Sequence, residues 1–133
     1  EMAHHAGLHH IRLIAPTTPP ERVKLLAENA AGFIYALSRT GVTGSHGAPS
    51  GKIGEQVTAI RSYTSLPVCV GFGITTAEQA AMVASIADGI VVGSAIVREI
   101  ELHADSPDVA QKVAAFTRPL IEAAKGAAIP GDS

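Results

Sequence analysis

Cysteine, excess charge and long apolar runs are all scarce in this sequence. Its 133 residues contain a single cysteine, Cys69, so no internal disulfide can form. Ten basic and twelve acidic residues give a formal net charge of −2, and no basic run stands out. Nothing therefore indicates nucleic acid or an anionic membrane surface as a partner. With no signal peptide or long apolar stretch, we expect a cytoplasmic protein that does not enter the membrane.

The composition fits one globular domain. A hydrophobic content of 47% with 17% charged residues is typical of a short chain with a single core. We expect residues 1–133 to form one partial domain and residues 126–133 to be a frayed tail. Four of the six histidines are His4, His5, His9 and His10. Lacking a set of cysteine or carboxylate partners, they are interpreted as a solvated helix end, and no metal site is predicted.

Apolar runs predict four strands, at residues 10–15, 33–37, 68–70 and 89–92. Helices are expected between and after them, because apolar residues recur there at intervals of three and four. These stripes are Val23, Leu26, Ala27 and Ala30; Ile53, Val57 and Ile60; Ala80, Val83, Ala84 and Ala87; and Val109, Val113, Phe116 and Leu120. Mainly apolar strands alternating with helices predict a parallel sheet covered by helices.

Two capping boxes are predicted to begin helices, one pairing Thr18 with Glu21 and the other pairing Thr75 with Glu78. A barrel of eight β/α units takes about 250 residues, so this chain is long enough for about half of one. A dinucleotide-binding fold is disfavoured, because no Gly-x-Gly-x-x-Gly follows the first strand.

The stretch Pro67–Thr76 carries the first predicted anion site. Its apolar run stops at Gly71 and Gly73 and is followed at once by a helix start, whose N–H groups can receive a phosphate. A second strand ends in Gly93-Ser94, and residues 94–101 are expected to form a short extra helix. Barrels of this kind often hold phosphate with the loops after strands 7 and 8 and such a helix. Glycine after a strand is often only turn chemistry, but two in tandem favour a shared phosphate site.

A long polar connection, residues 38–51, follows the second predicted strand. It exceeds the usual β-to-α connection of about two to six residues. An ordinary surface loop is the alternative, but an excess of loop at the carboxyl end of a strand favours a functional lid.

Three motifs together, Tyr35–Gly44, Gly71–Ile74 and Gly93–Val97, give the chain a resemblance to a known family. From about residue 5 to 125 it resembles the C-terminal half of the tryptophan synthase alpha subunit. The resemblance implies an α/β fold made of strands 5–8 of a (β/α)8 barrel with their helices. It also implies a lyase that converts indole-3-glycerol phosphate to indole and glyceraldehyde 3-phosphate by a retro-aldol reaction. The family's partner is a beta subunit carrying pyridoxal phosphate, so no cofactor is expected in this chain.

The resemblance also assigns roles to individual residues. It implies a phosphate cradle, a pocket wall and a lid. The cradle would be Gly44, Gly73, Gly93 and Ser94; the wall would be Tyr35, Phe72, Ile14 and Val91; the lid would carry Arg39 and Thr43, with Tyr35 and Thr43 supporting catalysis. In the lid this chain departs from the family after Gly44, where Ser45–Pro49 replaces a more charged stretch.

The largest departure concerns the acid and base. In the family a glutamate acts at the indole C3 position and an aspartate at the ring nitrogen, and both belong to the other half of the barrel. We expect no carboxylate here to replace them: Glu21 and Glu78 are helix-start residues, and Asp88 lies in a turn at the wrong end of the barrel. The 133-residue chain alone is therefore predicted to be inactive.

Two other functions stay open on the sequence. One is another phosphate-binding barrel, of the histidine-biosynthesis isomerase or cyclase type, although those lack the Ser-Arg-x-Gly-Val-Thr-Gly motif. The other is a non-catalytic phosphate-binding half-barrel that self-associates through the open edges of the strands at residues 10–15 and 89–92.

Overall fold

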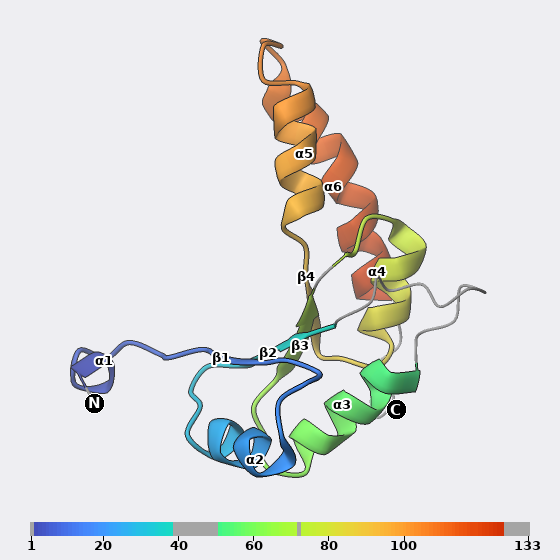
Figure 1. Cartoon of the computed structure of the whole chain (residues 1–133). Coiled ribbons are helices and arrows are strands. Elements are labelled where there is room, and N and C mark those ends of the chain that lie inside the picture. Colours follow the sequence, from blue (N-terminus) through green and yellow to red (C-terminus); the bar gives the residue numbers. More distant parts are fainter. Residues whose placement is uncertain (1, 39–50, 72, 127–133) are drawn as a thin grey trace.

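A computed structural model describes residues 2–38, 51–71 and 73–126 of the chain. Within these residues, four parallel strands pair in the order in which they occur along the chain. Helices separate the strands, and two more follow the last strand (Figure 1). The elements are α1 (Met2–His5), β1 (Arg12–Ile14), α2 (Pro20–Glu28), β2 (Ile34–Leu37), α3 (Gly51–Arg61), β3 (Val68–Gly71), α4 (Ala77–Ala84), β4 (Gly89–Val91), α5 (Ser94–Leu102) and α6 (Val109–Gly126).

Strand register separates the two faces of the sheet. Ile14, Ala36 and Val70 are partners in neighbouring strands, and each is no more than 1% exposed. One residue earlier in each strand, Leu13, Tyr35 and Cys69 are also partners, but they point to the other face because side chains alternate along a strand. On that face Leu13 is 53% exposed. The sheet thus has one face buried under helices and one open face.

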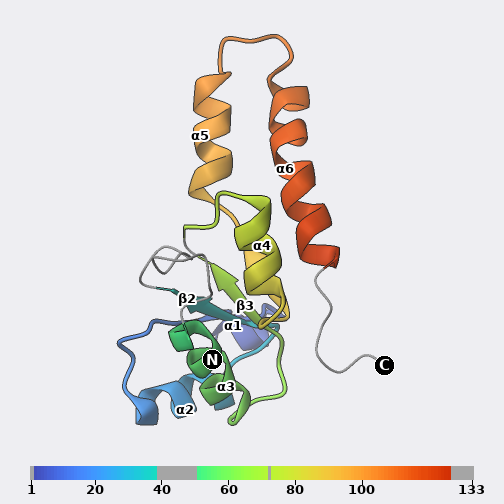
Figure 2. The same ribbon diagram turned by 90° about the vertical axis from the view of Figure 1, so that its right-hand side faces the viewer.

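The helices build one core on the buried face. Ile53, Val57 and Ile60 of α3 are buried together with the strand residues, as their spacing predicts. Ala80, Val83 and Ala87 from α4 and the turn after it are also buried, and Leu120 joins them from α6. Figures 1 and 2 show α5 and α6 side by side as a hairpin that extends away from the sheet. None of the described helices combines the length and the apolar character needed to cross a membrane.

Both predicted capping boxes need correction. The α2 N-cap is Pro19, without a side-chain cap. Thr18 instead accepts a hydrogen bond from the N–H of Ala15 at 3.0 Å, which bends the chain after β1. For α4 the box lies one residue later than predicted: Thr76 is the N-cap and Gln79 is its partner. A glutamine serves as well as a glutamate at that position, so the Glu78 side chain is not needed for the box.

Asp88 ties the amino-terminal ends of two strands to a helix. Its carboxylate accepts from the N–H of Val68 at 2.9 Å and pairs with Arg61 of α3 at 3.0 Å. Burial raises the pKa of Asp88, but the hydrogen bond from Val68 and the hydrogen bond and charge of Arg61 outweigh burial, so its pKa lies below the ordinary value. Asp88 therefore stands at the end of the sheet opposite to the strand ends that carry the glycines, as predicted.

This geometry predicts a modest, pH-dependent loss of stability for Asp88→Asn. The neutral amide can still accept from Val68 but loses the charge attraction to Arg61, and both side chains are partly exposed, so we expect a loss of roughly 0.5–1 kcal/mol. Because the folded pKa is lowered, the contribution of Asp88 is fully present above its unfolded pKa of about 3.9 and disappears as pH falls through the folded pKa.

Urea unfolding of both proteins at neutral and acid pH checks this prediction. The stability difference should shrink at acid pH and with added salt. A difference that stays the same between the two pH values would contradict the role assigned to the charge.

Candidate functional site

The candidate site lies on the open face of the sheet, at the carboxyl ends of the strands. Leu37, Gly71 and Val91 are register partners at the last positions of β2, β3 and β4. Because parallel strands end at the same edge of a sheet, the loops that follow all emerge here. The side chain of Tyr35, two residues before the end of β2, points to the same face as these partners.

Tyr35 lies directly over Gly71. A Cβ atom at residue 71 would stand 2.7 Å from the Tyr35 hydroxyl, 3.0 Å from its Cε2 and 2.9 Å from the Cβ of Val91. Only glycine leaves room for this ring. The structure thus brings together two predicted wall residues, Tyr35 and Val91, and adds Gly71, which was predicted to follow the strand as part of an anion site. Gly71 is in fact the last residue of β3, and the signal that could have found it is its place in the alternation opposite Tyr35.

Ile14, the third described wall residue, is not brought to this face. It is 0% exposed and is the register partner of Ala36 on the helix-covered side. Side chains alternate between the two faces along a strand, and Ile14 pairs with the residue that follows Tyr35. Its side chain therefore points to the face opposite to that of Tyr35. Ile14 therefore packs in the core in this structure. Two further predicted site residues with described positions, Gly73 and Gly93, lie just beyond the strand ends.

Gly73 has a φ of 76°, a backbone conformation that glycine adopts without strain. Gly93 is the N-cap of α5, where no side-chain cap occupies the helix end. A Cβ added to Gly93 would meet nothing within 4 Å. Ser94 follows as the first residue of α5, which agrees with the predicted short helix after β4.

The two helix starts near the site differ in what already occupies them. At α4, Thr76 accepts from the N–H of Gln79 at 3.2 Å, and Gln79 accepts from the N–H of Thr75 at 2.8 Å. The N–H of Glu78 and then the Thr76 hydroxyl lower the pKa of the Glu78 carboxyl, so a negative charge stands there already. At α5 the N-cap is Gly93, and within the described part of the chain no side-chain cap bonds to the first N–H groups of the helix. The α5 start is therefore better suited to an anion than the α4 start.

Arg39, Thr43, Gly44 and Phe72 lie outside the described residues. The lid and the corresponding parts of the cradle and wall therefore remain predictions.

Cys69 also points to the open face, between Tyr35 and Gly89 in register. Burial, and then the charge of Asp88, raise the pKa of its thiol, which leaves little thiolate at neutral pH. We therefore expect Cys69 to be an unreactive thiol. Among residues 2–38, 51–71 and 73–126, no cluster of three or more His, Cys, Asp or Glu side chains is placed to hold a metal ion.

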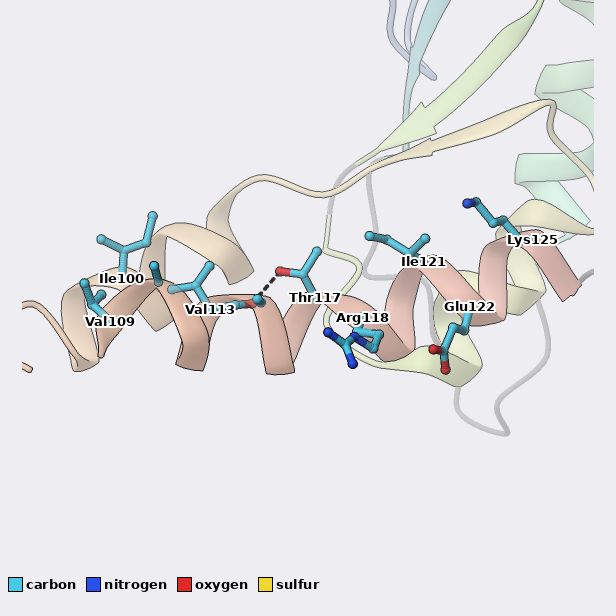
Figure 3. A pocket seen from close by; sticks show the side chains of 10 residues that line it. Ile100, Val109, Val113, Thr117, Arg118, Ile121, Glu122 and Lys125 are labelled. Atoms are coloured by element: carbon cyan, nitrogen blue, oxygen red, sulfur yellow. Dashed lines mark hydrogen bonds between the residues drawn. The ribbon is translucent and has the colours of Figure 1, made fainter. Parts of the chain in front are cut away.

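The cavities described next do not include the residues of the candidate site. A groove of about 1000 Å³ runs along α6 and is shown in Figure 3, with Ile100, Val113 and Ile121 among its apolar lining. In it the Thr117 hydroxyl donates to the carbonyl of Val113 at 2.7 Å. Another cavity of about 400 Å³ lies between α2, α3 and the carboxyl end of β1. Neither contains Tyr35, Gly71 or Gly93, so size alone does not locate the site.

Comparisons with known proteins agree on one family. A family model described as tryptophan synthase alpha chain matches residues 1–125. The tryptophan synthase alpha chain of Desulfatibacillum aliphaticivorans is 47% identical over 116 residues, which is 87% of this chain and 44% of that relative. That of Opitutus terrae is 46% identical over 120 residues, or 90% of this chain and 45% of the relative.

Solved structures give the same result. A structure of Mycobacterium tuberculosis tryptophan synthase superposes with a TM-score of 0.75 at 34% identity, covering 92% of this chain and 44% of that one. The predicted fold class, the C-terminal half of a (β/α)8 barrel, is confirmed. The chain spans less than half the length of these curated relatives.

The contact between Tyr35 and Gly71 predicts a contrast between two glycines. Gly71→Ala must displace the tyrosine ring or Val91, and we expect a loss of about 1–3 kcal/mol in unfolding free energy. Gly93→Ala projects into open space at a φ of −120° and should change stability by less than about 0.5 kcal/mol. Urea unfolding of both variants checks the contrast; equal losses would show that Tyr35 does not pack on Gly71.

Proposed function

Because the chain belongs to the tryptophan synthase alpha chain family, we propose that it supplies the substrate-holding half of a barrel that cleaves indole-3-glycerol phosphate. The products would be indole and glyceraldehyde 3-phosphate. The observation that carries this proposal is the edge where the Tyr35 ring covers Gly71 and where α5 begins at Gly93 without a side-chain cap.

At this edge the phosphate would sit on the N–H groups that open α5, with Gly73 and Ser94 beside it. Backbone N–H groups and the helix dipole can hold a dianion without a lysine or arginine. A Cβ added at residue 93 would meet nothing within 4 Å, so phosphate oxygens would have room beside this glycine. Gly44, carried over from the family, would complete this cradle.

The indole would lie against the open face of the sheet, where Tyr35 and Val91 present apolar surface. Phe72 would add a further aromatic contact, and Thr43 and Arg39 would belong to the lid that excludes water. Ile14 is not assigned a contact with indole, because it packs on the other face.

Proton transfer is the part of the reaction that we do not assign to these residues. The retro-aldol step needs a proton delivered to the indole C3 and a base that assists at the ring nitrogen, roles that the family gives to carboxylates of its other half. Here Asp88 pairs with Arg61 at the opposite end of the sheet, and Glu99 of α5 lies 3.6 Å from His103, the C-cap of that helix. The chain would orient the substrate without moving its protons.

Partners and location follow from the same proposal. The chain would work in the cytoplasm beside a beta subunit that carries pyridoxal phosphate, and it would need no cofactor of its own. Self-association is the second candidate function. It is favoured by β1 and β4, each paired on one side only among the described residues, and by the exposure of Leu13 on the open face.

An assay of turnover tests the proposed division of roles between the two halves of the barrel. The purified 133-residue chain should bind the substrate but release no measurable indole, because general acid and base groups typically supply a factor of about 10² to 10⁴ each. Adding the other half of a family barrel should restore some release. An indole assay with the beta subunit present throughout checks this. Steady release by the chain alone, persisting through further purification, would overturn the assignment.

A binding measurement tests the proposed phosphate site. Gly93→Val should greatly weaken glycerol phosphate binding while leaving the fold intact, since its side chain would fill the cradle and not the core. Arg39→Ala should cost less, because the proposed cradle relies on backbone N–H groups more than on lid charge. Calorimetric titration with glycerol phosphate, with circular dichroism as the folding control, compares the two. Equal losses would mean that the lid charge holds the phosphate.

A further inference from the structure

Gln56 of α3 reaches the carboxyl ends of two strands. Its side-chain nitrogen lies 3.3 Å from the carbonyl oxygen of Ile14 in β1 and 3.3 Å from that of Leu37 in β2. An amide NH₂ carries two hydrogens and can donate to both oxygens. Elsewhere α3 faces the sheet with Ile53, Val57 and Ile60, so Gln56 is a polar side chain beside the buried stripe of the helix. We explain this polar side chain by a backbone N–H donor that is missing where the two strands end.

The backbone pattern shows which donor is lacking. Ile34 and Ser38 of the β2 segment donate their N–H groups to Pro67 and Gly71, so these even-numbered residues face β3. Alternation then turns the carbonyl of Leu37 toward β1. Continuing the register of Tyr35 with Leu13 and Ala36 with Ile14, the ladder would bring the N–H of residue 16 to this carbonyl. Residue 16 is proline and has no N–H, while the N–H of Ala15 is bonded to Thr18.

We propose that Gln56 is a positioning residue that supplies the hydrogen bond missing at Pro16 and so fixes the end of β2 against β1. Leu37 is two residues beyond Tyr35 and is the register partner of Gly71. Holding the Leu37 carbonyl therefore holds the backbone that sets the Tyr35 ring over Gly71. The role of this arrangement in substrate binding rests on the function proposed above; the arrangement itself does not.

The test uses the tyrosine ring as its reporter. The chain has two tyrosines, Tyr35 and Tyr63, so fluorotyrosine labelling gives two ¹⁹F resonances, which Tyr63→Phe assigns. Gln56→Leu removes the donor at similar size and should shift and broaden the Tyr35 resonance. Gln111→Leu makes the same change at an exposed position of α6 and serves as the matched control. If Gln56→Leu does not fold, Gln56→Met replaces it, since it keeps length and flexibility without a donor.

Rescue makes the test specific. Pro16→Ala restores an N–H at residue 16, so in the Gln56→Leu background it should return the Tyr35 resonance toward the wild-type position. A merely structural role for Gln56 predicts no such rescue. The proposal is overturned if Gln56→Leu moves the Tyr35 resonance no more than Gln111→Leu does, or if Pro16→Ala brings no recovery.

A titration with indole-3-glycerol phosphate separates this inference from the proposed function. If both hold, Gln56→Leu weakens binding several-fold and Pro16→Ala in the same chain recovers it. If the Tyr35 resonance moves and recovers while affinity stays at the wild-type level, Gln56 positions the ring but Tyr35 does not contact the substrate. That result would contradict the proposed wall of the pocket and leave the assignment of Gln56 intact.

Discussion

The alternation of side chains along four parallel strands is the constraint on which the rest of the structure depends. In one phase, Ile14, Ala36 and Val70 meet the helices and form the core. In the other phase, Tyr35 and its register partners face away from the helices and remain open. A parallel sheet is normally covered on both faces, whereas the helices of the described residues cover only one face of this sheet. A shift of one residue in any strand would exchange the two sets.

Much of the fold could be predicted because its signals are local. The spacing of Ile53, Val57 and Ile60 is enough to define the buried stripe of α3, and the strands fall where the apolar runs lie. The start of α2 could not be predicted in the same way, because Thr18 has two possible N–H partners nearby and the structure uses Ala15, before the helix. A capping motif specifies which residues can bond, and the path of the chain decides which of them do.

The candidate site was predictable only in part, because its contacts join distant positions. Gly93 and Ser94 could be found from the strand-to-helix motif alone. The packing of Tyr35 on Gly71, the placement of Ile14 on the far face and the reach of Gln56 to two strand ends all depend on the register between strands. That register brings residues about twenty to forty positions apart into contact, and no local pattern encodes it. The parts that sequence reasoning missed are accordingly those that position the aromatic wall.

We propose that this chain would bind both ends of indole-3-glycerol phosphate, the phosphate at the start of α5 and the indole at the Tyr35 face. Paired calorimetric titrations of the same preparation with indole-3-glycerol phosphate and with glycerol phosphate test it most directly. We expect both ligands to bind, and indole-3-glycerol phosphate to bind more tightly because of its indole ring. Tyr35→Ala should abolish this difference in affinity, because it removes the ring against which the indole would lie. Equal affinity for the two ligands, unchanged by Tyr35→Ala, would show a phosphate site without an indole pocket and would contradict the account.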